Sequence, residues 1–431
     1  MKNAFLAAAV FFFLLAGQSW GQTVEEWDLR QSLEIGLKRN PRITAGKMGV
    51  EGAQARIKQN LADYYPHLFI ESDYSRIKGS FSGSKSAGDT PENNLYVYYL
   101  GLSQNIYDFG RREFKVQASR EDLKGYQWDF KDIRLLVMDT IRQAYYGILL
   151  SDRLVKVRLE DLERTQQNLR QAQGFYQVGL KAKIDVTQAE VEVIKAQKTL
   201  LNARNDAQLS RVLFEQALGL ERKTPSHNYR LKDDLEVGRV DWKLDDLKKE
   251  ALENHSLLNR LRATVKYWEA QEKVVSRDFW PSLTGTAKYG YGNLEALELV
   301  NLNWTLGLQL NIPIFSGFET KSRLAEVKAI LSQAKANEEL KRLEVLTELE
   351  GQYLNLLLAD KQIEVTEENL RKAKENLDLA MGRYKAGVGT MLEITDARVS
   401  LSQAETDHVL SLFDYKKSRF KIEKTLGRED F

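Results

Sequence analysis

The side chains best suited to chemistry in this sequence are two carboxylates that follow a glycine-containing turn. Glu393 and Asp396 are three residues apart, so a helix would place both on one face. Carboxylates held together raise one another's pKa and attract cations. The alternative is an ordinary solvated helix start, because acidic residues favour the first turn of any helix.

No pattern typical of catalysis accompanies these acids. The four histidines are scattered, no His-Glu-x-x-His or phosphate-binding loop occurs, and the chain has no cysteine for a thiolate metal site, a disulfide or a lipid anchor. We therefore expect no enzyme, no metal site and no cofactor. The 63 basic and 61 acidic residues are interspersed, which argues against a nucleic-acid partner.

The chain repeats itself, and this duplication defines its organisation. Gly387 lies 208 residues after Gly179, and Tyr384 lies 208 residues after Tyr176. The pattern predicts a first repeat over residues 22–219, a linker over 220–241 and a second repeat over 242–431. Each repeat has the same order: a helix, two strands, a very long helix, a glycine turn and a return helix.

The N-terminal residues predict export. Lys2 and the apolar run from Phe5 to Leu15 precede small residues at a cleavage position, so we expect a signal peptide over residues 1–21. An N-terminal membrane anchor is the alternative, although the run is short for a span.

Two proline-free segments predict unusually long helices. Apolar residues recur every three to four positions over about 110–173 and again over about 318–385. At 1.5 Å per residue each helix would be about 100 Å long, too long for a globular domain and typical of coiled coils. Return helices are expected over about 187–219 and 395–427, and single helices over about 28–62 and 243–278 before the strands.

Four segments alternate apolar and polar residues, as strands do, in pairs over about 67–107 and 282–312. In a soluble sheet the apolar face meets a core, whereas in a membrane barrel it meets lipid and the polar face lines a lumen. Four strands cannot close a barrel, and an open edge is not tolerated in lipid. If the strands span a membrane, subunits must share one barrel, and three copies would give twelve strands and an appreciable lumen.

The sequence resembles the TolC-type outer-membrane efflux channels over nearly all of its predicted mature length. The resemblance lies in the duplication, in the strand–helix junctions at 105–110 and 312–317, in the turn motifs at 175–180 and 383–388, and in the segment 392–397. No single motif is specific; their order, their offset and the absence of cysteine together are.

This resemblance implies an α+β membrane protein with an internal duplication. Three chains, contributing four strands each, would form a twelve-stranded barrel in the outer membrane of a Gram-negative bacterium, in contact with its lipid and continuous with a long periplasmic α-helical coiled-coil barrel. Such a homotrimer is the exit duct of a tripartite efflux or type I secretion system, joined to an inner-membrane pump through a periplasmic adaptor (membrane fusion protein). The alternative is a periplasmic coiled-coil structural or adaptor protein with a soluble β-domain.

In the family, the two glycine turns meet the adaptor. The residues expected at these tips are small or apolar, and exposed apolar groups usually indicate a partner. They are Val178, Gly179, Leu180, Ala386, Gly387 and Val388.

The resemblance also assigns the acids and the closed state. Matching family positions form acidic rings at the periplasmic constriction, which here would be built mainly from Glu393 and Asp396, with Asp185 in the first repeat. Family members held closed by a basic residue place it where this chain has Gly389. The first repeat has Lys181 instead, and Tyr176 and Tyr384 are further candidates for gate hydrogen bonds.

Overall fold

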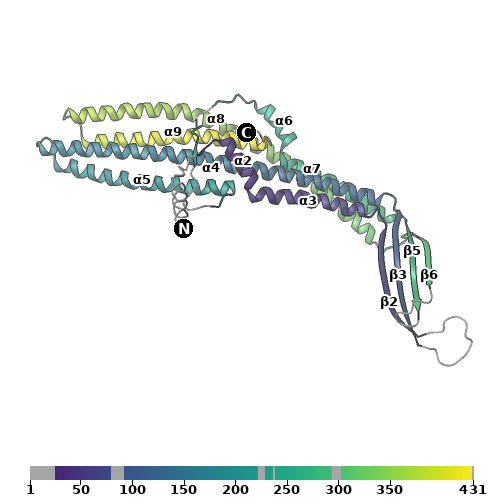
Figure 1. Ribbon diagram of the computed structural model, residues 1–431. Coiled ribbons are helices and arrows are strands. Elements are labelled where there is room, and N and C mark those ends of the chain that lie inside the picture. Colours follow the sequence, from purple (N-terminus) through teal and green to yellow (C-terminus); the bar gives the residue numbers. More distant parts are fainter. Residues whose placement is uncertain (1–24, 79–91, 222–228, 236–237, 294–301, 430–431) are drawn as a thin grey trace, which may run out of the picture.

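The computed structural model describes residues 25–78, 92–221, 229–235, 238–293 and 302–429 (Figure 1). The signal peptide expected over residues 1–21 lies outside this part of the chain. Both halves build the same series of elements. In the first half these are α2 (Leu29–Arg39), α3 (Pro41–Ala62), β2 (His67–Lys78), β3 (Glu92–Tyr107), α4 (Arg111–Gln177) and α5 (Lys183–Leu218). In the second half they are α6 (Leu244–Asn254), α7 (Ser256–Ser276), β5 (Ser282–Asn293), β6 (Leu302–Asn311), α8 (Glu319–Lys385) and α9 (Met391–Thr425).

The helix that precedes each strand pair is broken, so the expectation of single helices over 28–62 and 243–278 is wrong. In the first half, Asn40 ends α2 and caps α3 by accepting a hydrogen bond from Arg42 N–H, and Pro41 fills the first helical position. In the second half His255 has the same place, and its Nδ1 accepts a hydrogen bond from Leu258 N–H at 3.3 Å. Each cap side chain satisfies an orphan N–H at the start of the helix that follows it.

The long helices α4 and α8 each contain 67 residues, which corresponds to about 100 Å. Each begins directly after two residues with positive φ, Phe109–Gly110 and Gly317–Phe318, which turn the chain from strand into helix. Figure 1 shows α5 returning beside α4, and α9 beside α8, so that two helical hairpins extend away from the sheet. Helix α9 also packs against α4 and joins the two hairpins.

Two cores hold the hairpins together. Midway along the molecule, large side chains such as Tyr145, Phe214 and Phe420 pack around α4. Near the tips the core is mostly small and includes Ala172, Ala380 and Ala397, which allow the helices to approach closely.

The sheet has the antiparallel order β2-β3-β5-β6, which leaves β2 and β6 as edges. Residues aligned across it form apolar rows on one face, such as Ile70, Leu100, Tyr289 and Trp304. Ile70 is 82% exposed and Trp304 is 75% exposed. Within the described residues, no core covers this face.

The opposite face of the sheet is polar. Lys288 of β5 donates to Glu71 of β2 at 2.6 Å, and its ammonium lies 5.7 Å from the centre of the Tyr99 ring of β3 between them. One apolar and one polar face over the whole sheet match the alternation expected of lipid-facing and lumen-facing residues.

The described part of the linker fastens the N-terminal strand to the middle of the bundle. Strand β1 (Glu25–Trp27) pairs in parallel with β4 (Tyr229–Leu231), and the rings of Trp27 and Tyr229 stack 4.8 Å apart. The buried Tyr145 hydroxyl donates to the Lys232 carbonyl at 2.7 Å. The described residues of the linker, to which the sequence assigned no role beyond joining the repeats, thus contribute to the central core.

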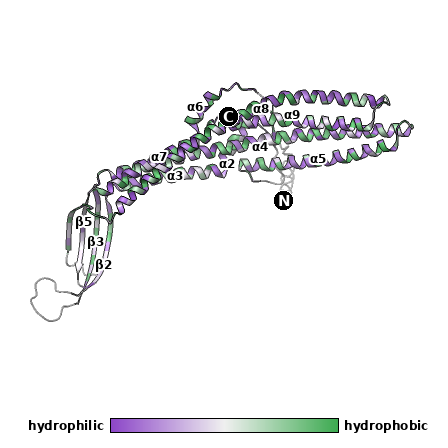
Figure 2. Cartoon of the chain, turned by 180° about the vertical axis from the view of Figure 1, so that it is seen from behind, coloured by the Kyte–Doolittle hydropathy of each residue, from purple (hydrophilic) through white to green (hydrophobic). Residues whose placement is uncertain are grey.

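Hydrophobic and hydrophilic residues alternate along the helices (Figure 2). Among the described helices, none has both the length and the apolar composition required for a membrane crossing.

Candidate functional site at the helix tips

The glycines expected at the tips end the two long helices. Gly179 has φ 77° and Gly387 has φ 82°, values that favour glycine. The N–H of Leu180 reaches back to the Phe175 carbonyl at 2.9 Å, and Val388 N–H reaches the Arg383 carbonyl at 3.1 Å. This is the pattern of a Schellman helix end. A Cβ added to either glycine would meet no atom within 4 Å, so the space beside both turns is open.

Apolar side chains surround these glycines at the solvent-exposed ends of the hairpins. Val178 is 68% exposed, and Leu180 and Val388 are each 69% exposed. Ala386 is also exposed. Apolar groups left in water at a projecting tip indicate a binding surface.

Two of the predicted gate residues, Lys181 and Tyr384, lie together where the two hairpins meet. Lys181 Nζ, just beyond α4, donates to the Gly389 carbonyl at 3.0 Å and lies 4.7 Å from the centre of the Tyr384 ring. The Tyr384 hydroxyl donates to Asp185 Oδ2 of α5 at 3.3 Å. We call Lys181, Asp185, Tyr384 and Gly389 the latch.

The latch tyrosine is almost fully buried. Tyr384 is 1% exposed and packs against Phe175, with ring centroids 5.7 Å apart. Burial, with a smaller contribution from the charge of Asp185, raises the pKa of Tyr384 to about 12. The hydroxyl therefore remains protonated and able to donate at every physiological pH.

Gly389 has a steric reason to lack a side chain. A Cβ there would lie 2.8 Å from Tyr384 N and 3.0 Å from the Arg383 carbonyl carbon, so the turn closes only with glycine. A basic side chain could not occupy this position without moving the backbone. Lys181 brings a cation to the same place from the other hairpin.

The two acids of the predicted constriction, Glu393 and Asp396, lie in different surroundings. Glu393 accepts from Arg383 Nε at 3.1 Å, and its N–H donates to the capping Thr390 hydroxyl at 3.3 Å. Asp396 is exposed. The hydrogen bond from Arg383 lowers the pKa of Glu393 in the protomer.

Tyr176 does not join the latch. Its side chain is 47% exposed, and its hydroxyl has no hydrogen-bond partner among the described residues. Within the protomer the two repeats therefore differ. The tyrosine of the second repeat is buried and hydrogen-bonded, whereas that of the first repeat is exposed to solvent.

A cluster of buried charged residues lies behind the tips, and the sequence patterns did not predict it. Arg398 of α9 makes two hydrogen bonds of 2.9 Å to Asp161 of α4 and also pairs with Glu192 of α5. Arg164 of α4 pairs with Glu405 of α9 at 2.8 Å. The only sequence signal was charged residues within the apolar pattern of three helices. The ion pairs of this cluster fix α9 against the first hairpin.

Comparison with known proteins agrees with this architecture. The family model described as "Outer membrane efflux protein" matches residues 33–220 and 247–428, one segment in each repeat. The pyoverdine export outer membrane protein OpmQ of Pseudomonas aeruginosa is 21% identical, over 99% of this chain and 92% of that protein. The cation efflux system protein CusC of Escherichia coli is 22% identical, over 85% of this chain and 79% of that protein.

Solved structures share the fold. VceC of Vibrio cholerae superimposes with a TM-score of 0.79 at 18% identity, covering 93% of this chain and 96% of that one. The CmeC channel of Campylobacter jejuni gives a TM-score of 0.80 at 18% identity, covering 93% and 85%. Because the family model matches most of both repeats, this chain belongs to the outer membrane efflux protein family.

Proposed function

We propose that this outer membrane efflux channel works as a homotrimer whose periplasmic tips dock onto an adaptor and, through it, an inner-membrane pump. The proposal rests on surfaces of the protomer that lack a partner within the described residues. These are the two edges of the sheet, the exposed apolar rows of α5 and α8, and the helix tips. It conducts passively and carries no catalytic group. A soluble periplasmic scaffold, the alternative drawn from sequence, would leave the apolar face of the sheet exposed to water.

Two helix edges support a closed ring. Helices α5 and α8 each carry a row of apolar residues, 44% to 67% exposed, with helical spacing. On α5 these are Ile184, Val191, Ile194, Leu201, Leu209 and Leu213. On α8 they are Leu340, Leu343, Leu354, Leu357, Leu358, Val365 and Leu379. Edges that differ favour a head-to-tail contact, which closes into a ring when the rotation permits.

The sheet supports the same arrangement. Its edges, β2 and β6, have no further partner among the described strands, and an unpaired edge cannot remain in lipid. Pairing β6 of one subunit with β2 of the next satisfies both edges, and three copies of a four-stranded sheet give twelve strands. The rows that include Ile70 and Trp304 would then face lipid, and Glu71 and Lys288 would face the lumen.

Engineered cysteines test the ring, because the natural chain contains none. We expect one cysteine on α5 (Leu201→Cys) combined with one on α8 (in turn Leu354→Cys, Leu358→Cys or Val365→Cys) to cross-link on oxidation in membranes. At least one pair should give covalent dimers and trimers and nothing larger. Ala196→Cys, on the buried side of α5, replaces Leu201→Cys as the control and should give none. Monomers alone from all pairs, or a ladder beyond three, would refute the trimer.

The constriction is proposed to lie at the start of α9, as in the acidic rings that the family resemblance implies. In the protomer the charge of Glu393 is compensated by Arg383, whereas Asp396 has no ion-pair partner among the described residues. Asp396 therefore supplies most of the uncompensated charge that selects for cations.

We predict that Asp396→Asn lowers cation selectivity more than Glu393→Gln. The measurement is the reversal potential of trimers in planar bilayers under a KCl gradient, with the double variant as the limiting case. Equal effects of the two substitutions would show that Arg383 does not compensate Glu393 in the trimer. No effect of either would place the constriction elsewhere.

The cargo is set outside this chain. The similar proteins are named for the export of pyoverdine, of toluene and of cations, although their chains align with this one over similar lengths. We propose that the pump selects the substrate, and the duct conducts what the pump delivers.

A further inference from the structure

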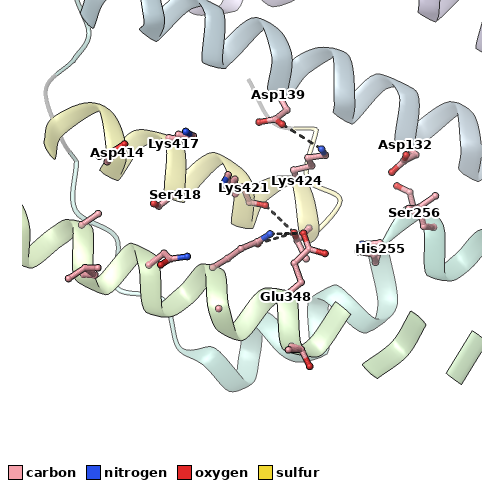
Figure 3. A pocket seen from close by; sticks show the side chains of 18 of the residues that line it. Asp132, Asp139, His255, Ser256, Glu348, Asp414, Lys417, Ser418, Lys421 and Lys424 are labelled. Carbon is pink, nitrogen blue, oxygen red and sulfur yellow. Dashed lines mark hydrogen bonds and ion pairs between the residues drawn. The ribbon is translucent and has the colours of Figure 1, made fainter. Parts of the chain in front are cut away.

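A cavity of about 720 Å³ opens midway along the helices, where α9 ends and α7 begins between α4 and α8 (Figure 3). Its walls come from elements far apart in the sequence. Asp139 lies on α4, Ser256 on α7, Glu348 on α8, and Lys417, Lys421 and Lys424 on α9. The volume is within the range of small-molecule sites, roughly 300–1,000 Å³.

Two buried polar atoms in this wall lack a partner within the described structure. Asp139 is 8% exposed and Ser256 is 3% exposed, and neither Asp139 Oδ1 nor Ser256 Oγ has a hydrogen bond. The other oxygen of Asp139 faces Lys424 Nζ at 3.5 Å. Buried polar atoms are nearly always satisfied, so an unsatisfied pair lining one cavity points to an occupant that supplies a hydrogen-bond donor.

Two of the lysines can bind an anionic group of the occupant. Of the four that line the cavity, Lys424 faces Asp139, and Lys341 pairs with Glu344 at 3.1 Å. Lys417 and Lys421 have no ion-pair partner in the described residues, although the acids Asp132, Glu348 and Asp414 also line the walls. Burial, with the nearby charges of Lys341 and Lys424, lowers the pKa of His255 to about 4 and leaves its ring neutral.

Helix geometry relates the cavity to the duct. Asp414 follows Asp396 by eighteen residues of α9, which is five turns, so both lie on one side of that helix. Ser418 and Lys421, four and seven residues further on, keep to the same side. If Asp396 faces the axis of the duct, as the proposed function requires, the cavity opens to the lumen.

We propose that this cavity is a binding site in the duct wall for a small organic anion that also carries a hydroxyl or amino group, and that it holds such molecules in transit. Lys417 and Lys421 bind the anionic group, and Asp139 and Ser256 bind the donor. The inference rests on the proposed function for its place in transport. The binding site itself is built within one protomer.

N-dansyl-serine, a fluorescent anion at pH 8 that carries both a carboxylate and a hydroxyl donor, is the probe. We expect saturable binding by fluorescence anisotropy at pH 8 with the full-length protein in a nonionic detergent. The double substitution Lys417→Gln and Lys421→Gln should weaken it about tenfold or more, because charge-assisted hydrogen bonds are lost. Ser256→Ala should weaken it several-fold. Lys248→Gln, a lysine of α6 that pairs with Glu350 and does not line the cavity, should leave binding unchanged.

Each outcome decides between the claims. Absence of saturable binding would mean that the cavity takes no such anion, and binding equally sensitive to Lys248→Gln would mean that surface charge alone attracts the probe. Either result would overturn the site. Size exclusion and bilayer conductance of the same samples report on the duct separately. A conducting trimer without binding refutes the site alone, and binding without a trimer or conductance refutes the duct alone.

Discussion

Gly387→Trp is expected to reduce export to the level of cells that lack the protein, whereas Gly387→Asn is expected to leave it close to normal. Both substitutions place a side chain at φ 82°, which costs about 1–2 kcal/mol and is easiest for asparagine. That cost is small beside the 5–15 kcal/mol that separates folded from unfolded domains. Since a new Cβ meets no atom within 4 Å, the indole would project outward into the docking surface.

The comparison is made in a deletion strain carrying each variant. A panel of toxic compounds and metals first identifies one to which loss of the protein sensitises the cells, and resistance to it is then measured. Gly179→Trp and Gly179→Asn repeat the test on the other hairpin, and outer-membrane trimer levels are followed throughout. Full resistance with tryptophan at both positions would show that the tips are not the docking surface.

Removing the latch is expected to open the duct at rest. Tyr384→Phe deletes the hydrogen bond to Asp185, and Lys181→Ala deletes the one to the Gly389 carbonyl. Each involves a charged group and is worth about 1.5 kcal/mol at the low end, so loss of both shifts the closed–open equilibrium about a hundredfold. We expect larger resting conductance of single trimers and uptake by cells of a large antibiotic that the outer membrane excludes.

Tyr176→Phe is the matched control for this prediction. It removes the same atom from the equivalent residue of the first repeat, where the hydroxyl is exposed. We expect its conductance to equal that of the natural protein. If the latch double variant conducts no more than Tyr176→Phe, the contacts between the hairpins do not hold the closed state.

The elements with a long periodic signal were predictable from sequence. The helices α4 and α8 have sustained apolar spacing over 67 residues, and the four long strands alternate, so period alone distinguishes them. The break before α7 was not predicted because its cap is His255, and histidine is not among the usual capping residues. The break before α3 has a local signal, because Pro41 cannot continue a helix and fits its first position.

The contacts between the hairpins could not have been read from local patterns. Lys181 and Gly389 are 208 residues apart in the sequence, and they come into contact because α9 packs against α4. Arg383 reaches Glu393 over a turn of ten residues and compensates the charge of that carboxylate. Arg398 of α9 is buried between Asp161 of α4 and Glu192 of α5. Such pairings depend on how helices are placed together, which a helical period does not specify.

The most direct test of the account is photo-crosslinking in living cells from probes placed at Val178 and Ala386, followed by identification of what is captured. The same probe at Met48, an exposed residue of α3 on the sheet side of the molecule, is the control. We predict that both tip probes capture a periplasmic adaptor protein and that the Met48 probe does not. Capture of only other copies of this chain from both tips would contradict docking and leave a trimeric pore without a pump.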